Sequence, residues 1–581
     1  MATILVGPRL GPPSDSGFSV WLRLDSSIET ITLEAREYAS GDAWSLASAA
    51  KPVSSKRDTI VLSASSLSAG VRYEYRISDE SAVLHSSSTW TMPGNSSRVR
   101  FYVYWVSDTH EDNDSAYTQI LDDFETNVEP LGIPAFILQG GDLVVPGNKA
   151  TIELWGDEVE LELAKIAGSG KATERLPYLY NTDDHDSYGN NCSVEFSIAF
   201  GSEPGGHIAA GLEAYDWYWR DQPTLPIGTA NQGFYTEVCG IPFIGADCRT
   251  FRSPQYGTTP DEPPFITDGN EDYDPAAPTR TFLGVAQRDW LIDKFLDLKG
   301  RRELIFFHTS ECWLSKINKQ ARVPGVAPPS PGARDSVGIF WEPERNYFLR
   351  RLAPSYATSG EILWIHGDDH RNAVWKTRYN ESTTWSTYLP GAVPGVGIGW
   401  HGYTFITRAG SNDTGVGGSS SLFGEGDILD MRTAFLGALV KMQVDVGPQG
   451  VAPELRMTYR EIAFNSSILG DVYVGSRGGN VGREGDFLWR AGRLYWADDS
   501  TDVLTGAPYR AQSFPPENGQ YGVSFKRTFI EQVGGLPDRD VMRDSKGRLA
   551  AYHLIDKLDR EDERYRQPGP RRVEIPPEPL G

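Results

Sequence analysis

The sequence is poor in cysteine and contains fewer basic than acidic residues. Its 581 residues include only four cysteines, Cys192, Cys239, Cys248 and Cys312, without CxxC spacing. This density argues against a disulfide framework, and Cys239 and Cys248 are expected to be buried thiols. The 55 Lys and Arg against 78 Asp and Glu give a formal net charge of −23. That balance argues against a broad nucleic-acid groove, although a phosphate substrate remains compatible if bound cations reverse the local field.

Long apolar runs are also missing. No stretch reaches the length that a helix needs to cross a bilayer, so no transmembrane segment is expected. The first residues, MATILVGPRLGPPSD, lack a basic segment followed by a long apolar one, and they lack twin arginine. We therefore expect no secretory signal and place the chain in the cytoplasm or in a virion or other particle.

The chain is long and contains many turn-forming residues. A chain of 581 residues rarely folds around a single hydrophobic core, so about three domains are expected. The 60 Gly and 38 Pro indicate many loops. Residues 1–97 contain short alternating segments such as FSVWLRL and VRYEYRIS, typical of an all-β sandwich.

Residues 98–465 alternate strand-like runs with helical periodicity, for example YTQILDDFETNV, IELWGDEVELELAKIA and QRDWLIDKFLDL. This alternation predicts an α/β domain. EPGGHIAAG, with His207, is assigned to a surface loop. Residues 466–581 form a β-rich extension in which FLWRAGRLYW predicts a hairpin, followed by a Pro-rich tail.

Five strand-like runs end directly in Asp or His. They are FYVYWVS before Asp108 and His110, PAFILQG before Asp142, LPYLYNT before Asp183-Asp184-His185-Asp186, ELIFF before His308, and EILWIHG before Asp368 and His370. One such junction is an ordinary turn. Five in one α/β domain place carboxylates and imidazoles at the carboxyl edge of a sheet, where ligands bind. The pattern predicts a metal centre, with two ions given the number of ligands.

The spacing suggests how the ligands divide. Asp108 and His110 alternate on an extended turn, so both can face one ion. Asp142 follows two glycines that let the backbone come close, which makes it the natural bridging carboxylate. The second ion can then be completed by Asp184, His308 and His370, with Asp368 nearby.

In this order the motifs resemble the calcineurin-like metallophosphoesterases, and within them the branch of PhoD-like alkaline phosphatases and phosphodiesterases. Asp183-Asp184-His185-Asp186-Ser-Tyr-Gly-Asn-Asn is similar to the DDHDYGxN block of that branch, and Ala246-Asp247-Cys-Arg249 begins a stretch similar to its LDTRxxR strand. LGVAQRDWL at 283–291 and GDDH at 367–370 resemble its LGxxQxxWL and GDxH motifs. The resemblance covers roughly residues 1–465, and six motifs in the same order are a specific signal.

The resemblance implies a two-sheet metallophosphoesterase sandwich preceded by an immunoglobulin-like β domain. It implies that Asp108, His110 and Asp142 hold the first ion, and that Asp184 takes the place of the usual asparagine ligand beside His308 and His370. His185 would be the acid that protonates the leaving oxygen, with Asp183 or Asp186 orienting its ring. A bridging hydroxide would attack phosphorus between the two ions.

Two departures from the branch concern the ions. Leu143-Val144-Val145 follow Asp142 where many relatives carry a tyrosine that ligates iron, and the first motif is D-x-H without cysteine. Both departures favour a plain pair of divalent ions (Ca, Mn, Mg, Zn or Fe), whose identity stays open.

Several alternatives stay open. Arg249 is either a phosphate ligand or part of a structural ion pair with Asp247, and His401 is either a substrate contact or a loop-surface residue. The substrate is a phosphoester such as a phospholipid, a nucleotide or a wall polymer, cleaved as a diester or a monoester. The other class of function is a structural or receptor-binding component of an assembly such as a phage tail. It would self-associate or dock through residues 466–581.

Overall fold

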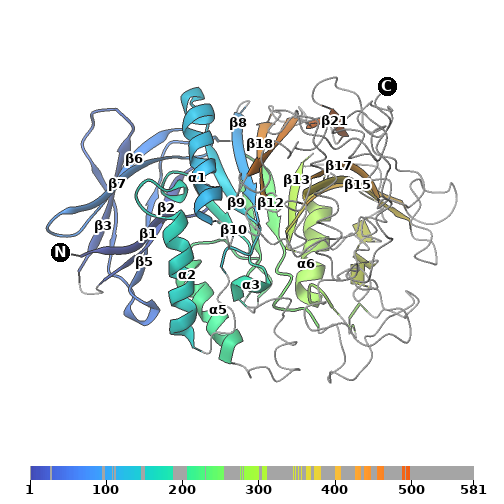
Figure 1. Cartoon of the computed structure of the whole chain (residues 1–581), viewed down its shortest axis with the longest axis horizontal. Helices are drawn as coiled ribbons and strands as arrows, with labels where there is room; N and C mark the ends of the chain where they lie inside the picture. Colours follow the sequence, from blue (N-terminus) through green and yellow to red (C-terminus); the bar gives the residue numbers. More distant parts are fainter. Residues whose placement is uncertain are drawn as a thin grey trace, which may run out of the picture.

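The computed structural model describes residues 2–25, 29–94, 99–107, 109, 113–144, 151–187, 206–228, 231–253, 281–299, 304–310 and 362–367. It also describes isolated positions at 275–278 and 344–355, and the strands that lie between 372 and 496. In these described residues the architecture is mixed α/β, with four sheets and few helices (Figure 1).

The N-terminal region consists of two antiparallel sheets. The first has the strand order β1 (Ile4–Leu10), β2 (Gly17–Leu24) and β5 (Thr59–Ser65). The second has the order β4 (Ser45–Ala50), β3 (Ile31–Glu37), β6 (Arg72–Ser78) and β7 (Val83–Trp90). Burial alternates along β6, where Tyr73, Tyr75 and Ile77 point into the core. The all-β pattern of the sequence therefore corresponds to two facing sheets, while the immunoglobulin-like assignment and the boundary at 97 stay predictions.

A seven-stranded sheet follows, with the order β10-β9-β8-β18-β19-β20-β21. Strands β8 (Val99–Val106), β9 (Ala135–Gln139) and β10 (Tyr178–Tyr180) are parallel. Strands β18 (Gly437–Val446) and β19 (Glu454–Ile462) extend the sheet antiparallel to β8. The predicted hairpin of FLWRAGRLYW is confirmed, because β20 (Phe487–Arg490) pairs with β21 (Arg493–Trp496). This hairpin joins the same sheet through β19.

The second large sheet has the order β11-β12-β13-β14-β16-β15-β17. Strands β12 (Ile241–Gly245), β13 (Ile305–Thr309), β14 (Ile362–His366) and β16 (Gly399–Ile406) are parallel. Antiparallel strands flank them: β11 (Phe234–Val238) on one side, β15 (Asn372–Asn380) and β17 (Gly426–Arg432) on the other. Cys239, in the turn between β11 and β12, and Cys248 are free and buried, as expected.

The two large sheets face each other across an apolar core. The side chains of β8 point alternately into this core and to the opposite face of the sheet. Phe101, Val103 and Trp105 point toward the second sheet and pack with Phe243 and Phe306. The intervening residues of β8 pack on the opposite face, against the helices α1 (Asn113–Asp123), α2 (Ile152–Ile166) and α5 (Gly206–Tyr218).

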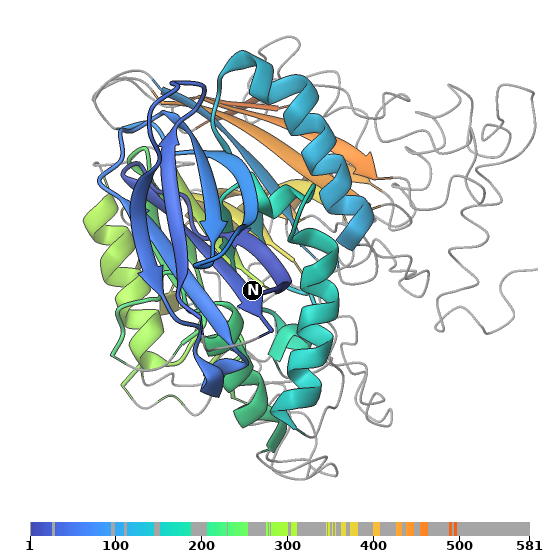
Figure 2. The same cartoon turned by 90° about the vertical axis from the view of Figure 1, so that its left-hand side faces the viewer.

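Helix α6 (Val285–Leu298) covers the outer face of the second sheet (Figure 2). The layers are thus helix, sheet, sheet and helix. Three of the helices match predicted periodic segments, although α1 begins four residues earlier and continues into a π-helical turn, Phe124–Val128. The loop assignment of His207 is wrong, because this residue lies in α5.

The N-terminal sheets pack directly on the α1, α2 and α5 side. The guanidinium of Arg9 is fully buried, donates to the Tyr218 carbonyl at 2.9 Å and pairs with Asp221 at 2.7 Å. It lies over the ring of Trp219, 4.8 Å from the centroid. The backbone N–H of Tyr178 in β10 donates to the carbonyl of Gly11 at 2.8 Å, so this junction also contacts the edge strand of the first large sheet.

Within the parts of the chain that the structure describes, no helix combines the length and the apolar character needed to cross a membrane.

Candidate metal centre

The carboxyl ends of the parallel strands of both large sheets meet at one edge. The chain leaves β9 through Gly140, whose N–H donates to the Val106 carbonyl of β8 at 2.7 Å. Gly367, just after β14 of the other sheet, lies against this turn, since a Cβ built on it would be 3.2 Å from the Gly140 carbonyl oxygen. The strand ends that the sequence singled out are therefore neighbours in space.

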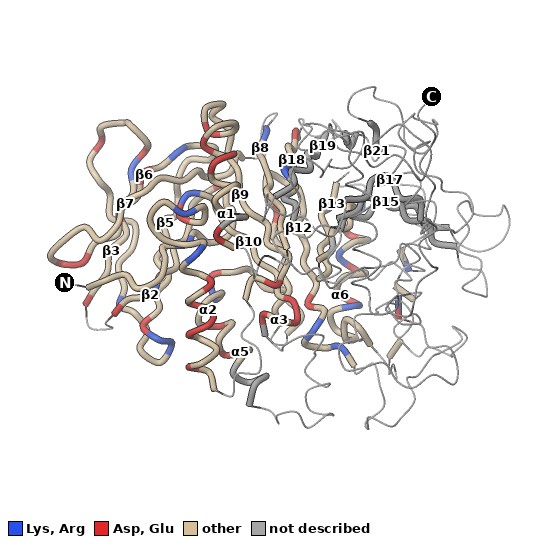
Figure 3. The backbone as a smooth tube through the Cα atoms, in the orientation of Figure 1, with Lys and Arg blue, Asp and Glu red and all other residues tan. Residues whose placement is uncertain are grey.

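Asp142, Asp184 and His185 form the centre of this edge. One ligand atom from each side chain lies within 4.8 Å of the others. Both carboxylates are buried and the imidazole is half-buried. The N–H of His185 donates to Asp184 Oδ1 at 2.8 Å and to Asp142 Oδ1 at 3.3 Å. The acidic residues of the short helix α3 (Asp184–Ser187) lie between the two sheets (Figure 3).

The approach of the two loops depends on glycine. Gly141 has φ +102°, and a Cβ on it would lie 2.6 Å from Asp183 Cβ and 3.0 Å from the Asp183 nitrogen. Asp142 itself has φ 55°, an uncommon left-handed conformation for a residue with a side chain. The sequence Gly140-Gly141-Asp142 thus lets the turn after β9 contact the start of α3.

Asp186 holds these two loops together. One of its carboxylate oxygens accepts the N–H groups of Asp142 at 2.7 Å and Asp183 at 2.8 Å. The other accepts the N–H groups of Leu143 at 2.8 Å and Val144 at 3.1 Å. Burial raises the pKa of Asp186 to about 6, while the bonds from the backbone act in the opposite direction. Asp186 therefore fixes the backbone that presents Asp142.

Arg249 pairs with Asp183 rather than with Asp247. Its guanidinium is fully buried and lies 2.6 Å from Asp183 Oδ1, while the Asp184 carboxylate is 3.8 Å away. Asp247 instead accepts the backbone N–H groups of Arg249 at 3.1 Å and Gln232 at 2.8 Å. The Arg249 cation thus sits beneath the α3 carboxylates and lowers the electrostatic cost of gathering them.

His308 is the next-to-last residue of β13, on the opposite sheet. Its ring is buried, with Nδ1 2.8 Å from Asn181 Nδ2, and burial lowers its pKa to about 3, so the ring is neutral. Its Nε2 has no hydrogen-bond partner among the described residues. A Cβ at position 140 would be only 2.6 Å from this Nε2, so the missing side chain of Gly140 leaves space beside the buried nitrogen.

The remaining predicted site residues either lie outside the described residues or lie away from this edge. Asp108, His110, Asp368 and His370 lie outside the described residues, although the strands that lead to them end at this edge. His401 lies in β16, where Ile406 pairs with His366 at the end of β14. Five residues of strand, roughly 16 Å, separate His401 from the carboxyl edge, so the structure does not bring it to the centre.

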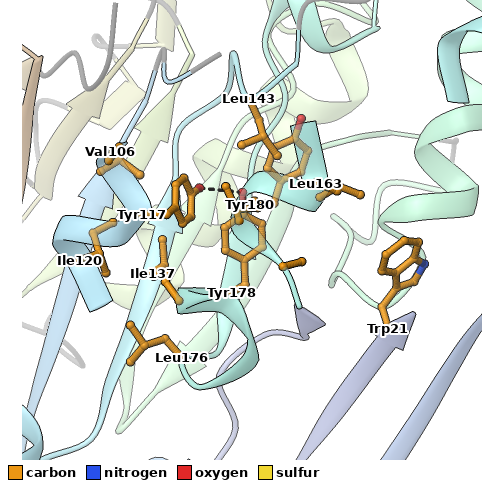
Figure 4. Close-up of a cluster of buried hydrophobic side chains, with 14 of the residues drawn as sticks. Trp21, Val106, Tyr117, Ile120, Ile137, Leu143, Leu163, Leu176, Tyr178 and Tyr180 are labelled. Carbon is orange, nitrogen blue, oxygen red and sulfur yellow. Dashed lines mark hydrogen bonds between the residues drawn. The ribbon is translucent and has the colours of Figure 1, made fainter. Parts of the chain in front are cut away.

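Several supporting residues were not predicted. Gln139, the last residue of β9, donates to the Gly141 carbonyl at 2.8 Å and accepts from Tyr117 at 2.8 Å. The Tyr117 and Tyr178 hydroxyls lie 3.1 Å apart beneath the turn, as the dashed line in Figure 4 marks. A polar residue at the buried end of an apolar strand, as in Gln139 and Asn181, is the signal that could have found them.

The donor set fits divalent cations. Asp142, Asp184 and His185 offer two carboxylates and an imidazole within a few ångströms of one another. On the facing sheet, His308 Nε2 lies beside Gly140, two residues before Asp142, and has no hydrogen-bond partner among the described residues. Carboxylate oxygens with imidazole nitrogens suit several divalent ions, so the donor types leave the choice of metal open.

Comparison with known proteins agrees with this architecture. No protein-family model matches the chain, and no curated protein matches it by sequence. A structure of PhoD superposes with a TM-score of 0.58 at 14% identity, covering 91% of this chain and 98% of that one. Purple acid phosphatase PPD1 from yellow lupin (Lupinus luteus) seeds gives a TM-score of 0.44 at 11% identity, covering 78% and 71%. The match to PhoD shows that the two chains share an overall fold.

Proposed function

We propose that this protein is a metal-dependent phosphoester hydrolase of the PhoD-like type. The observation that carries the proposal is the convergence of Asp142, Asp184 and His185 within 4.8 Å at the carboxyl edge of a PhoD-like pair of sheets. Such an edge is where this class of fold binds its ligands.

The residues divide into two sets of ligands. Asp108, His110 and Asp142 would hold one divalent cation. Asp184, His308 and His370 would hold the other, with Asp368 nearby and Asp142 shared between the two. Bound there, the ions would supply a water-derived nucleophile and neutralise the charge on the phosphoryl oxygens.

The protein's own side chains would perform the proton transfer and the positioning. His185 lies beside both central carboxylates and would give a proton to the leaving oxygen. Asp186 would keep the turn of Asp142 in place through its four backbone bonds. Asp183 would keep the start of α3 in place through Arg249. In this proposal Arg249 acts from beneath the centre, because its guanidinium is buried against Asp183.

The proposed substrate is an exposed phosphoester. Two classes are to be compared: phosphodiesters, such as a phospholipid or a wall polymer, and phosphomonoesters. The proposed organisation is a β domain at 1–97, the hydrolase at 98–465 and an extension from 466.

The test is hydrolysis of bis-p-nitrophenyl phosphate and p-nitrophenyl phosphate after EDTA treatment, with Mn, Ca, Mg or Zn restored. Asp142→Asn and His185→Ala should each abolish turnover. Asp297→Asn is the matched control, because this carboxylate lies on α6 with about half its side chain exposed.

Turnover that depends on added metal, is lost in both site variants and persists in the control would support the proposal. Turnover that survives exhaustive chelation, or that His185→Ala leaves intact, would contradict it.

A further inference from the structure

Asn181 lies between the two sheets and contacts both. It follows β10 directly, is fully buried, and donates its backbone N–H to the Gln139 carbonyl at 3.0 Å. Its side-chain Nδ2 lies 3.2 Å from the Ala246 carbonyl oxygen and 2.8 Å from His308 Nδ1. Its Oδ1 has no partner in the described part of the chain.

With the carboxamide in this orientation, the contacts imply which ring nitrogen carries the proton. An amide nitrogen carries two hydrogens and accepts none, so Nδ2 donates one to Ala246 and the other to His308 Nδ1. A neutral imidazole carries one proton, and Nδ1 must be the acceptor in this arrangement. The proton is therefore on Nε2, which in that form cannot bind a cation.

Turning the carboxamide over reverses this state. A half rotation about the Cβ–Cγ bond of Asn181 exchanges Oδ1 and Nδ2 at nearly constant volume. Oδ1 then accepts a hydrogen bond from the Nδ1–H group of His308 and gains a partner, while Nδ2 gives up its hydrogen bonds to His308 and to the Ala246 carbonyl. The proton leaves Nε2 and one is taken up at Nδ1, so the ring stays neutral and Nε2 presents a lone pair.

We propose that Asn181 is a positioning residue that selects which nitrogen of His308 carries the proton, and that its carboxamide turns over when a divalent cation binds at Nε2. This inference rests on the proposed metal-dependent function. It adds a two-state residue beneath the centre. Residues that hold the distal nitrogen of a metal-binding histidine fix its tautomer, and replacing them commonly weakens metal binding about 10–100-fold.

The variants separate the two orientations. Asn181→Asp retains only acceptors when ionised, so it favours the proton on Nδ1 and should bind cations at least as tightly as the wild type. Asn181→Leu removes both functions and should weaken binding about 10–100-fold. The matched control is Asn231→Leu, because Asn231 also donates its side-chain nitrogen to a buried carbonyl, that of Leu225 at 2.9 Å.

The measurements are Zn²⁺ affinity by chelator competition and long-range ¹⁵N–¹H spectra of histidine-labelled full-length protein. His308→Gln identifies the His308 signals among the nine histidines. In the wild type the proton should be on Nε2 after EDTA and on Nδ1 after Zn²⁺ is added. This spectrum tests the inference even if a variant does not fold.

A proton on Nδ1 before Zn²⁺ is added would overturn the inference, and so would wild-type affinity in Asn181→Leu. The outcomes also separate the two proposals. If His308→Gln binds Zn²⁺ as tightly as the wild type, the metal-centre assignment itself fails. If His308→Gln weakens binding and Asn181→Leu does not, only the role of Asn181 fails.

Discussion

Gly140→Ala is the most direct test of the edge where the two sheets meet. The added methyl carbon would lie 2.6 Å from His308 Nε2, 3.0 Å from Ser107 Cβ and 3.2 Å from Trp105 Nε1. Non-bonded heavy atoms prefer about 3.5–4.0 Å, so the closest contact is about 1 Å too short. His308 cannot simply withdraw, because its ring is buried with Asn181 on its other side.

The expected cost follows from two opposing effects. Overpacking of a dense interior typically costs about 1–3 kcal/mol. The backbone at Gly140 does not have a positive φ, so alanine also reduces the entropy of the unfolded chain, which stabilises by about 0.4–1 kcal/mol. The net loss in the free energy of unfolding should be about 1–2 kcal/mol. Cation affinity should also fall, by at least about tenfold, because the added methyl group and a bound cation compete for the space around Nε2.

Urea unfolding and Zn²⁺ competition measure the two quantities. Gly94→Ala is the matched control, since its new methyl group would meet only Ala69 Cβ at 3.4 Å, an ordinary contact. If Gly140→Ala were as stable as the control and bound Zn²⁺ as tightly as the wild type, the placement of His308 at the metal centre would be refuted.

The other predictions concern buried charge and strained backbone. Burial raises the pKa of Glu344 to about 7, so its stabilising contribution, about 3 kcal/mol, is complete below about pH 4.5 and is lost as pH rises through 7. Urea midpoints at pH 5 and pH 8 should therefore differ more in the wild type than in Glu344→Gln, and equal differences would refute the assignment. Arg249→Met should cost about 3–5 kcal/mol, because the buried Asp183 carboxylate loses its guanidinium. Adding Asp183→Asn should recover part of that loss in a double-mutant cycle, whereas strict additivity would mean the two are not coupled. Gly141→Ala should cost about 2–4 kcal/mol in urea unfolding, since it combines φ +102° with a 2.6 Å approach to Asp183 Cβ; a loss below about 1 kcal/mol would contradict this.

The sequence predicted the location of the centre because parallel strands share a carboxyl edge. An Asp or His near the end of such a strand has little choice of position, and the structure brings Asp142 and Asp184 together with His185 at this edge. The division of the ligands between two ions stays a prediction. Strand periodicity also anticipated the all-β start of the chain and the hairpin at β20 and β21.

The ion-pair partner of a side chain, and the position of a residue along its strand, were harder to predict. Asp247 stands two residues from Arg249 in the sequence, yet the guanidinium reaches Asp183, 66 residues away, because the fold brings α3 beside the end of β12. His401 follows a glycine-rich loop that looks like a site rim, but the pairing of β16 with β14 places it at the other end of the strand.

The glycines of EPGGHIAAG suggested a loop. In the fold, the helix α5 that begins there is stabilised by the burial of Ala214, Trp217 and Tyr218 against the sheet. Tertiary burial of this kind overrides local propensity and leaves only a weak mark on the sequence.

The buried Arg9 has a consequence for cooperativity. Its charge is balanced by Asp221 and enclosed by Trp21, Tyr178 and Trp219, so pulling the N-terminal sheets away would expose both an aromatic surface and a carboxylate that had been paired. The two regions should therefore melt together in one calorimetric transition rather than in two. A cut near residue 97 would not leave an independently stable remainder of the chain, and any exchange of the N-terminal region for a foreign one would have to reproduce this cation and the aromatic rings around it.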